Sequence, residues 1–263
     1  MNSRHNAPDQ GMTTAIIPAY NEAGRIGNVL TALHDVDSIL EIIVVDDGSK
    51  DSTLEEVRQV AIKDKRIKIF QHETNKGKGE TIFTGARLAK TPYLLFLDAD
   101  LINLKPRNIN ALIRPVQSGD ADMTLGLFLG GKISTDIPHW VNPTLTGQRC
   151  LRADLIRYVS VEAAQGYGIE IAITIAAFKE HYRVKYVALK GVWHPPSEFH
   201  RGFFSGVAWR ANMYAEILRA WKVGRGTDAL TERMIYEPTQ QMRTYILSRY
   251  RKAKRRAVAI LRR

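Results

Sequence analysis

The chain has 263 residues, of which 44% are hydrophobic and 25% are charged, an ordinary composition for one large or two small globular domains. Its net charge of +11 is unevenly distributed, because Arg243–Arg263 holds nine Arg or Lys and no acid, which leaves +2 for the other 242 residues. A near-neutral body with one basic end differs from a uniformly basic nucleic-acid-binding domain, so no nucleic-acid partner is expected. The single cysteine, Cys150, excludes a disulfide within the chain and fits a reducing compartment.

Apolar runs and helix-spaced segments alternate through the first half of the chain. Strands are predicted at residues 13–20, 42–45, 66–72 and 93–97, and helices at residues 21–36, 51–61 and 79–90. This alternation is typical of βαβ units and predicts an α/β fold with a mainly parallel central sheet flanked by helices. In such sheets ligands bind beyond the carboxyl ends of the strands.

The second half of the chain is less regular. Its predicted elements are a strand at 121–128, a loop at 129–143, a helix beginning within 145–159, a helix at 166–182, a strand at 183–189 and a helix at 203–221. The loop has two adjacent glycines and two prolines and is long enough to be a lid or to contact an acceptor. No sharp domain boundary is visible. We therefore expect a flexible leader at 1–12, one domain at 13–222 and a C-terminal extension at 223–263 that forms a basic amphipathic helix.

Three successive predicted strands end in polar tips, PAYNE at 18–22, VDDGS at 45–49 and LDAD at 97–100. Carboxylates two positions apart, such as Asp98 and Asp100, can both reach one hard divalent cation when the backbone turns between them. Mg²⁺ or Mn²⁺ held by one or two carboxylates and bridging substrate phosphates is the usual arrangement. A solvated turn is the alternative for these two acids, and the coincidence of three polar tips favours a site.

Two neighbouring segments are ambiguous on their own. Asp46 and Asp47 lie in a DDGS quartet of the kind that usually forms a turn, although a carboxylate at a buried strand end can also accept a hydrogen bond from a nucleobase N–H. The NKGKG segment at 75–79 puts two lysines among glycines ahead of a helix, which suits a diphosphate. It matches neither of the common Gly-rich phosphate-binding motifs, so alone it is a weak indication.

In this order, PAYNE, VVDDGSKDST, NKGKG and LDAD resemble the motifs of the family 2 glycosyltransferases of the GT-A fold, a Rossmann-like α/β fold. The likeness is strongest to the polyprenyl-phosphate (dolichyl-phosphate) mannose and glucose synthases, with some likeness to glucosyl-phosphoglycerate synthases. It covers residues 13–128 with all four motifs in order, and residues 144–200 more loosely. Any one of the motifs would be weak, and their order makes the resemblance specific.

The resemblance implies a metal-dependent hexosyltransferase. It would move a hexose from a UDP- or GDP-linked sugar to a phosphate-bearing acceptor, with Mg²⁺ or Mn²⁺ neutralising the leaving diphosphate as a Lewis acid. Polyprenyl phosphate at the cytoplasmic membrane face is the expected acceptor, and a small soluble acceptor such as a phosphoglycerate is the alternative. Two interpretations of another class stay open, namely nucleotide-sugar binding without turnover and nucleic-acid binding through the tail. A homo-oligomer is also left open.

The resemblance also implies site residues, carried over position by position. Those expected at the nucleotide sugar are Pro18, Tyr20, Glu22, Asp46, Asp47, Lys78, Asp98 and Ala99. Those expected at the metal are Asp98, Asp100 and His194, and those expected to act in catalysis are Asp100, Glu170 and Arg149. Those expected at the acceptor phosphate, to which an Arg fork is geometrically suited, are Gln148, Arg149 and Arg152.

The chain departs from the family pattern directly after the two acids. Polyprenyl-phosphate mannose synthases usually continue with LQHP, whose Gln can assist the metal, whereas this chain has Ile102 at that position. A further protein ligand would have to come from elsewhere, and His194 in VWHPP follows a predicted strand. Some GT-A enzymes supply such a late histidine. The alternative is a surface or structural histidine.

The TGQRCLR segment at 146–152 has an alternative interpretation as the solvated start of a helix. In that case Arg149 and Arg152 would lie on the outer face of the helix and would not bind an acceptor. Glu170 lies among apolar residues, which should raise its pKa unless it is paired. We expect it to face the acceptor as a base or binding group, or instead to orient Arg149, because an ionised phosphate acceptor needs no base.

The tail places apolar residues at helical spacing among basic ones from Met242 to Arg263. A basic amphipathic helix suits an anionic membrane surface, where each basic residue contributes about 1 kcal/mol. Peripheral association with the cytoplasmic face of the membrane is therefore expected. Packing on a partner subunit and a disordered tail are the alternatives.

Overall fold

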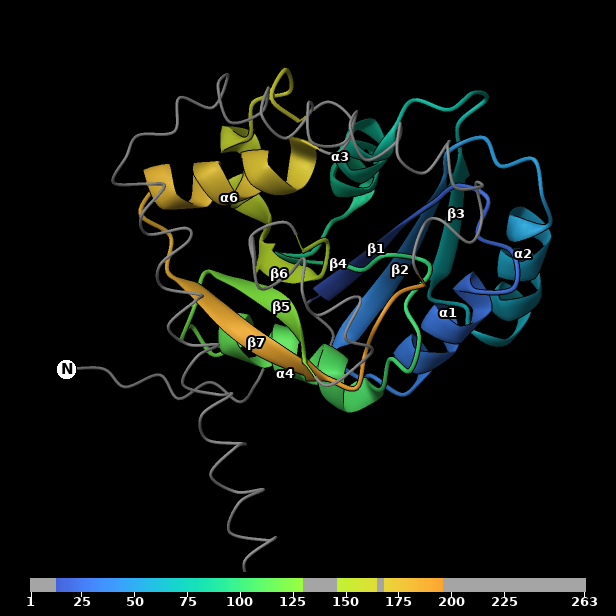
Figure 1. Cartoon of the computed structure of the whole chain (residues 1–263), viewed down its shortest axis with the longest axis horizontal. Coiled ribbons are helices and arrows are strands. Elements are labelled where there is room, and N and C mark those ends of the chain that lie inside the picture. The colour runs from blue at the N-terminus through green and yellow to red at the C-terminus, as the bar shows by residue number, and fades with distance from the viewer. Residues whose placement is uncertain (1–12, 130–145, 165–167, 196–263) are drawn as a thin grey trace, which may run out of the picture.

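The computed structural model describes residues 13–129, 146–164 and 168–195, which build one central sheet with helices on both faces (Figure 1). The strands are β1 (Thr13–Ala19), β2 (Ile39–Asp46), β3 (Ile67–Gln71), β4 (Tyr93–Phe96), β5 (Met123–Leu129), β6 (Arg149–Arg152) and β7 (Val184–Lys190). The helices are α1 (Ile26–His34), α2 (Thr53–Lys63), α3 (Lys78–Leu88), α4 (Pro106–Gln117), the short 3₁₀ helix η2 (Ala153–Tyr158) and α6 (Ile169–Lys179).

The strands of the described sheet follow the order β3-β2-β1-β4-β6-β5-β7. β1 pairs in parallel with β2 and β4, β2 pairs in parallel with β3, and β5 pairs in parallel with β7. β6 runs antiparallel to both of its neighbours, β4 and β5. Because β1, β2 and β4 share one direction, their carboxyl ends meet at one edge of the sheet. This edge is called the carboxyl edge below, and the opposite one the amino edge.

Alternate side chains of β1 fill two separate cores. On one face, Ala15 and Ile17 lie in the core formed with α1, α2 and α4. On the other face, Ile16 packs with α3, η2 and α6. A strand buried on both faces explains why its sequence is a nearly continuous apolar run. α3 lies so close to β1 that a Cβ at Gly85 would meet Ile16 Cγ2 at 2.4 Å, so a larger residue there would have to displace the strand.

The predicted mainly parallel sheet flanked by helices is confirmed, but the helix expected to begin within 145–159 is wrong. Residues 149–152 form β6, and only the following Ala153–Tyr158 is helical, as a 3₁₀ turn. β6 has four residues, too few for a periodic pattern to show in the sequence. It exists because it pairs with β4 and β5, which are distant in the chain.

Several expectations lie outside the described residues. They are the leader at 1–12, the loop from residue 130 onward, the helix at 203–221 and the tail at 223–263. The domain boundaries therefore stay predictions. Within the described ranges, none of the helices is long and apolar enough to cross a membrane.

Candidate functional site

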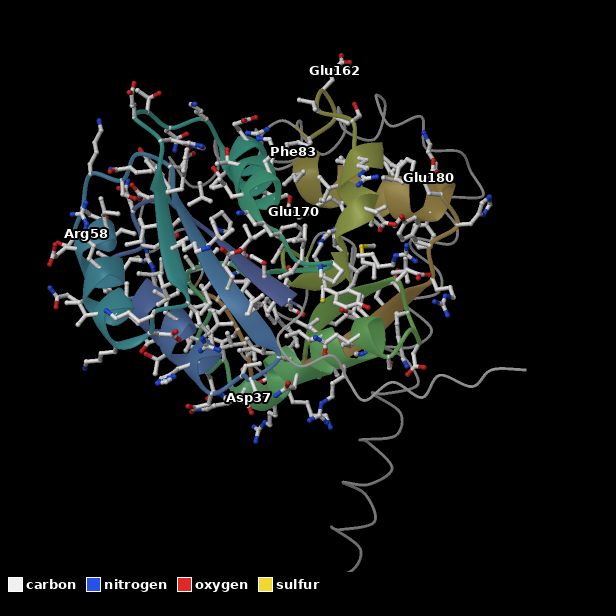
Figure 2. All side chains as sticks on the ribbon, turned by 180° about the vertical axis from the view of Figure 1, so that it is seen from behind. Asp37, Arg58, Phe83, Glu162, Glu170 and Glu180 are labelled. Atoms are coloured by element: carbon white, nitrogen blue, oxygen red, sulfur yellow. The ribbon has the colours of Figure 1, made fainter. Side chains whose placement is uncertain are left out.

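The polar strand tips predicted from the sequence meet at the carboxyl edge. Residues 20–25 follow β1, residues 47–52 follow β2 and residues 97–100 follow β4. α3 and α6 cover the sheet on the same side (Figure 1). Figure 2 shows Phe83 of α3 and Glu170 of α6 in this layer. The candidate site therefore lies where the carboxyl edge of the sheet meets α3 and α6.

Lys78, the first residue of α3, links two acids at this edge. Its Nζ lies 2.7 Å from Asp98 Oδ1, after β4, and 2.7 Å from Glu170 Oε1, in the first turn of α6. Burial alone would lower the pKa of Lys78, but the two carboxylates outweigh it and raise the pKa well above its usual range. The ammonium therefore stays charged and neutralises part of an acidic group.

Asp98 and Asp100 have opposite pKa shifts. For Asp98, burial acts to raise the pKa, but Lys78 and other donors outweigh burial and hold the pKa below its usual value. For Asp100, burial and then the charge of Asp98 raise the pKa. Both oxygens of Asp98 accept a hydrogen bond, whereas no donor among the described residues reaches the Asp100 carboxyl. Asp100 therefore has the larger free capacity to coordinate a cation.

Glu22 adds a third carboxyl to the group. It follows β1, and its pKa is raised to about 7, first by burial and then by Asp100, while Arg25 acts in the opposite direction. Arg25 Nε lies 2.6 Å from Glu22 Oε2. Carboxyl groups that raise one another's pKa in this way form a site whose ionisation a bound cation would favour.

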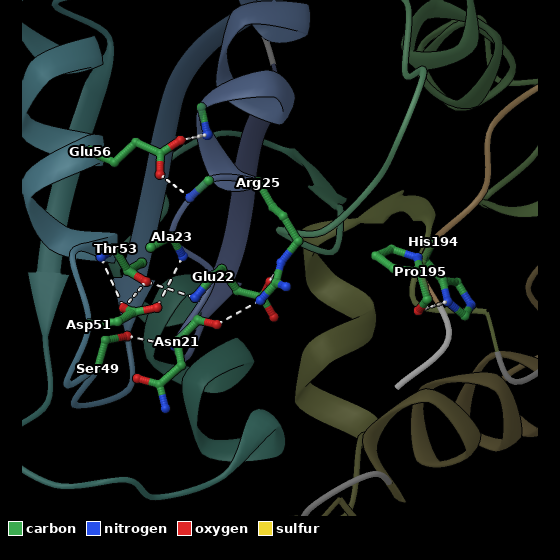
Figure 3. A network of polar contacts seen from close by, with 12 residues as sticks. Asn21, Glu22, Ala23, Arg25, Ser49, Asp51, Thr53, Glu56, His194 and Pro195 are labelled. Carbon is green, nitrogen blue, oxygen red and sulfur yellow. Dashed lines mark hydrogen bonds and ion pairs between the residues drawn. The ribbon is translucent and has the colours of Figure 1, made fainter. Parts of the chain in front are cut away.

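The loop that carries Glu22 is held by the turn before α2 and by α2 itself (Figure 3). The Glu22 N–H donates to Thr53 Oγ1 at 2.7 Å, and the Ala23 N–H donates to Asp51 Oδ2 at 3.2 Å. Asp51 in turn accepts from the Thr53 N–H at 3.0 Å. The two strand tips PAYNE and VDDGS are thus tied into one unit.

Glu56 of α2 closes the same loop. Its carboxylate accepts from the N–H groups of Gly24 and Gly27 at 2.6 and 2.9 Å. Gly24 has a φ of +77°, which residues with side chains rarely adopt, and a Cβ at Gly27 would meet Glu56 Oε1 at 2.5 Å. The sequence reasoning missed Glu56, because its partners lie 32 and 29 residues away and no local pattern marks them.

Asp47 holds the NKGKG segment in place. Its carboxylate accepts from the N–H groups of Lys76 and Gly77 at 2.9 and 2.8 Å, and it faces His72 Nδ1 at 2.7 Å. His72 is 4% exposed, and its other ring nitrogen lies 3.1 Å from Thr84 Oγ1. Asp47 therefore fixes the approach to α3, a role that the sequence reasoning did not assign, and His72 was missed altogether.

The other residues expected at the nucleotide also lie at the carboxyl edge. Asp46 is fully buried at the end of β2, where its Oδ2 accepts from the Ser49 N–H at 3.3 Å. Its Oδ1 has no hydrogen-bond partner among the described residues. A buried acceptor without a donor costs about 1–3 kcal/mol, so it marks a place where a ligand N–H would be stabilising. Pro18 and Tyr20 are half-buried at the end of β1, and Ala99 is buried between the acids.

β6 brings only part of the TGQRCLR segment to the acids. Gln148 is 1% exposed and its side chain contacts Asp98, so it lies beneath the acids. Arg152 lies away from the acids, and its acceptor contact stays a prediction. β6 pairs Arg152 with Tyr93, the first residue of β4, so Arg152 is at the amino edge. A strand advances about 3.3 Å per residue, whereas the predicted helix would have kept both arginines near one end.

Arg149 is buried, so the alternative of a solvated position is wrong for Arg149, whereas Arg152 is exposed. The side chain of Arg149 is 1% exposed, and its guanidinium donates to the backbone carbonyls of Thr146 and Glu170. Burial lowers the pKa of Arg149 to about 10, against the opposing effect of Glu170. Arg149 thus joins the start of β6 to the start of α6. Its catalytic role and its acceptor contact stay predictions.

Glu170 presents a second buried oxygen without a partner. Its Oε1 pairs with Lys78, while its Oε2 has no hydrogen-bond partner among the described residues. Arg149 contacts the backbone carbonyl of Glu170. Lys78 therefore joins the carboxyl of Glu170 to that of Asp98, and the catalytic role of Glu170 stays a prediction.

His194 lies beside the acids because an isolated antiparallel bridge joins Trp193, the residue before it, to Ile102, two residues after Asp100. The Ile102 N–H donates to the Trp193 carbonyl at 2.8 Å, and the Trp193 N–H donates to the Ile102 carbonyl at 3.2 Å. After burial and Lys78, His194 is among the groups that act to lower the pKa of Asp98, and it acts likewise on Asp100. Figure 3 shows His194 and Pro195 at the far side of the site.

The donor set suits a divalent cation, although it is not closed around one. Within the described residues, no three His, Cys, Asp or Glu side chains are gathered tightly enough to hold a metal ion as they stand. Asp98 and Asp100 offer carboxylate oxygens, which Mg²⁺ and Mn²⁺ prefer, and His194 offers an imidazole nitrogen, which transition-metal ions bind more readily than Mg²⁺ does. The raised pKa of Asp100, caused by burial and Asp98, shows that Lys78, which is paired with Asp98, compensates Asp100 less than Asp98. The residues present therefore fit the ion.

The fold and this edge define an α/β protein with a largely parallel sheet, whose ligand site is built from carboxylates and one lysine beyond the strand ends. The chain belongs to glycosyl transferase family 2, whose family model matches residues 14–180.

Two curated relatives show how far the likeness extends. A dolichyl-phosphate beta-glucosyltransferase of Trichomonas vaginalis is 36% identical over 103 residues, which are 36% of this chain and 31% of that protein. A glucosyl-3-phosphoglycerate synthase of Mycolicibacterium paratuberculosis is 26% identical over 199 residues, which are 63% of this chain and 59% of that protein. The chain thus spans less than two thirds of the length of either relative.

A solved structure shares the fold. It is glucosyl-3-phosphoglycerate synthase from Mycobacterium tuberculosis in complex with Mn²⁺, UDP and glucosyl-3-phosphoglycerate, with a TM-score of 0.63 and 22% identity. The match covers 81% of this chain and 80% of that one. The GT-A fold expected from the four motifs is thereby confirmed.

Proposed function

We propose that the chain is a glycosyltransferase that moves a hexose from a UDP-linked sugar to a phosphate-bearing acceptor and depends on Mg²⁺ or Mn²⁺. The observation that carries the proposal is the acidic pair at the carboxyl edge, with Asp98 held by Lys78 and Asp100 left without a donor among the described residues. Membership of the family supports the reaction. The Mn²⁺ and UDP complex of the M. tuberculosis synthase supports the cofactor and the donor base.

The donor half of the site would be divided among five side chains. Asp98, Asp100 and His194 would hold the cation, which supplies Lewis-acid neutralisation of the diphosphate when bound. Lys78 would exchange its carboxylate partners for the diphosphate, acting as a point charge next to the leaving group. The unpartnered Oδ1 of Asp46 would accept a base N–H, which a uracil ring offers.

Glu170 would act on the acceptor side. Its Oε2 is buried without a partner, so a hydroxyl brought next to it would find a ready hydrogen-bond acceptor. For a hydroxyl nucleophile, Glu170 is the group placed to take the proton. A phosphate nucleophile is already ionised and would need only the countercharge of Lys78.

Two acceptors are supported by different observations. A small phosphorylated acid is supported by the glucosyl-3-phosphoglycerate synthases, whose likeness extends over 63% of the chain in sequence and 81% in fold. Polyprenyl phosphate, the acceptor expected first from the sequence, is supported by the dolichyl-phosphate relative over 36% of the chain. Peripheral binding to the cytoplasmic membrane face through the tail would accompany this second acceptor. We rank the soluble acceptor first because its support covers more of the chain.

The test is a transfer assay with Mn²⁺, labelled UDP-hexose, and either phosphoglyceric acid or a polyprenyl phosphate in detergent. Label in the aqueous product would identify the soluble acceptor, and label extracted into organic solvent the lipid. Asp100→Asn removes one carboxylate at nearly constant size and should lower transfer about 100-fold or more, because metal stabilisation of the leaving group amounts to several kcal/mol.

Asp120→Asn is the matched control, since Asp120 is an exposed acid three residues before the start of β5, at the amino edge. It should transfer at the wild-type rate. Equal transfer by Asp100→Asn and wild type would refute the metal assignment. Transfer to neither acceptor, with UDP-hexose bound, would refute the proposed acceptor class.

A further inference from the structure

Gln148 is the buried side chain that fixes Asp98. Its Oε1 accepts the backbone N–H of Asp98 at 3.0 Å, and its Nε2 donates to Asp98 Oδ2 at 2.5 Å. A backbone N–H can only donate, so it must face the amide oxygen, and the amide NH₂ is left for the carboxylate. The orientation of the Gln148 amide is therefore set by chemistry, and one side chain holds both the backbone and the carboxylate of Asp98.

The two oxygens of Asp98 have partners of different kinds. Oδ2 accepts from the neutral amide of Gln148, and Oδ1 lies 2.7 Å from the charged Nζ of Lys78. Lys78 is a long half-buried side chain that can leave Asp98 for a ligand phosphate. Gln148 is 1% exposed and has no such freedom. A neutral donor also leaves the negative charge of Asp98 intact, so it orients the carboxylate without competing with a cation for it.

The backbone around Gln148 is shaped to bring it against the acid. A Cβ at Gly147 would stand 2.7 Å from both carboxylate oxygens of Asp98, so any side chain there would push the carboxylate away. On the other side, a Cβ at Gly126 of β5 would come within 3.1 Å of Gln148 Cβ. Two glycines therefore let β6 and its approach lie between β5 and Asp98 with the amide pressed onto the carboxylate.

We propose that Gln148 is a positioning residue that fixes the carboxylate of Asp98 for binding of a hard divalent cation together with the donor diphosphate. The inference rests on the proposed function. It replaces the acceptor contact expected for Gln148 from the sequence, because the side chain is 1% exposed and its oxygen and nitrogen both face Asp98, so it is not presented to an acceptor.

The test measures Mn²⁺ binding to the full chain in the presence of UDP, from the loss of the free Mn²⁺ signal in electron paramagnetic resonance. This readout needs no turnover. Gln148→Met keeps the length of the side chain and removes both hydrogen bonds, and it should raise the Kd for Mn²⁺ about 10-fold or more, as removal of a group that orients a metal ligand typically does. Gln148→Asn keeps the amide but is too short to reach both groups of Asp98, and should give an intermediate Kd.

Thr124→Val is the matched control. Thr124 is fully buried in β5 and bonds to Leu112 and Cys150 but to neither Asp98 nor Asp100. The Kd of the Thr124→Val variant for Mn²⁺ should therefore equal that of wild type. An unchanged Kd in Gln148→Met would overturn the inference, as would an equal weakening by Thr124→Val. Should Gln148→Met fail to fold, the folded Gln148→Asn decides in the same way. Failure of the proposed function is a separate result, in which the wild-type chain binds no Mn²⁺.

Discussion

Glu22 and Asp100 are two acids whose pKa values are raised for the same two reasons, burial and a neighbouring carboxyl. Ionising either one costs folding free energy, so the fold is less stable with both charges present than it would be without them. Such a cost is common where charges are gathered for a ligand. The stability of the metal-free chain should therefore depend on pH in a direction that identifies these acids.

Stability without metal should fall as the pH rises from about 4.5 to about 7. Glu22 has its ordinary pKa of 4.5 when unfolded and a pKa of about 7 when folded, so in this window the unfolded chain has released a proton that the folded chain still holds. Rising pH therefore favours unfolding until both states are ionised. Urea unfolding in a chelator should show up to about 3 kcal/mol less stability at pH 8 than at pH 5.

Glu22→Gln should remove most of this pH dependence, because the amide does not titrate. Glu55→Gln is a suitable comparison, since the exposed Glu55 contacts only Gln59 of its own helix. If Glu22→Gln keeps the wild-type slope between pH 5 and pH 8, Glu22 is not the group responsible.

At the residue scale, the sequence revealed the groups that face a ligand better than the groups that hold them. Asp98 and Asp100 stand out because two acids end an apolar strand. His72 and Glu56 act on partners 25 and about 30 residues away and sit in segments with no local signature, and Gln148, which was expected at the acceptor, bonds to a partner 50 residues away. Side-chain contacts of this kind depend on the folded arrangement and leave no spacing pattern in the chain.

At the element scale, α2 and the loop after β1 behave as one unit. Glu22 N–H bonds to Thr53, and Glu56 accepts two N–H groups of the loop, so the position of the loop follows that of the helix. The loop carries Glu22 and follows directly from Tyr20, both expected at the nucleotide. A change on α2 that never touches a ligand should therefore alter ligand binding.

Glu56→Ala should cost about 1 kcal/mol of stability and raise the KM for UDP-hexose severalfold, because it frees the N–H groups of Gly24 and Gly27. kcat should change less, since the acids after β4 are untouched. Glu55→Ala, one residue earlier on the same helix, should leave KM unchanged. An equal KM for Glu56→Ala and wild type would show that the loop keeps its position without α2.

The elements themselves were predictable where pattern and length agreed. β1, β2, β4 and β5 contain buried apolar runs, and α1, α2 and α3 have helical spacing, whereas α4 was not predicted. β6 was taken for part of a helix, because a four-residue strand inserted antiparallel between β4 and β5 is defined by its neighbours.

At the scale of the whole molecule, the sheet separates two differently built edges. The carboxyl edge gathers acids that lack full compensation, whereas Asp122 and Asp154 at the amino edge are paired with arginines. Arg152, for example, lies 2.6 Å from Asp154 and 3.7 Å from Asp122, and Arg183 lies 2.9 Å from Asp122. Surface pairs of this kind contribute little to stability, and their charges are already compensated, so they do not indicate a ligand site.

Arg152→Ala should therefore leave transfer within about twofold of wild type and cost no more than about 1 kcal/mol of stability, because its ion pairs are exposed. Steady-state kinetics with both acceptors and a urea titration would measure the two effects. A large rise in the KM for the acceptor would support the acceptor contact that the sequence suggested for Arg152. Arg157→Ala, a change of another exposed arginine in the following 3₁₀ turn, serves as the comparison.

The pairing of Ile102 with Trp193 has a consequence for the order in which the site is assembled. It is a single bridge outside the named strands, between positions far apart in the chain, so a long loop must be closed before its two hydrogen bonds can form. Contacts of this type are expected to form late and to open first, while β1, β2 and β4 stay closed. The amides of Ile102 and Trp193 should exchange with deuterium together and faster than those of β1. Their common exchange rate would report how often His194 leaves the acids.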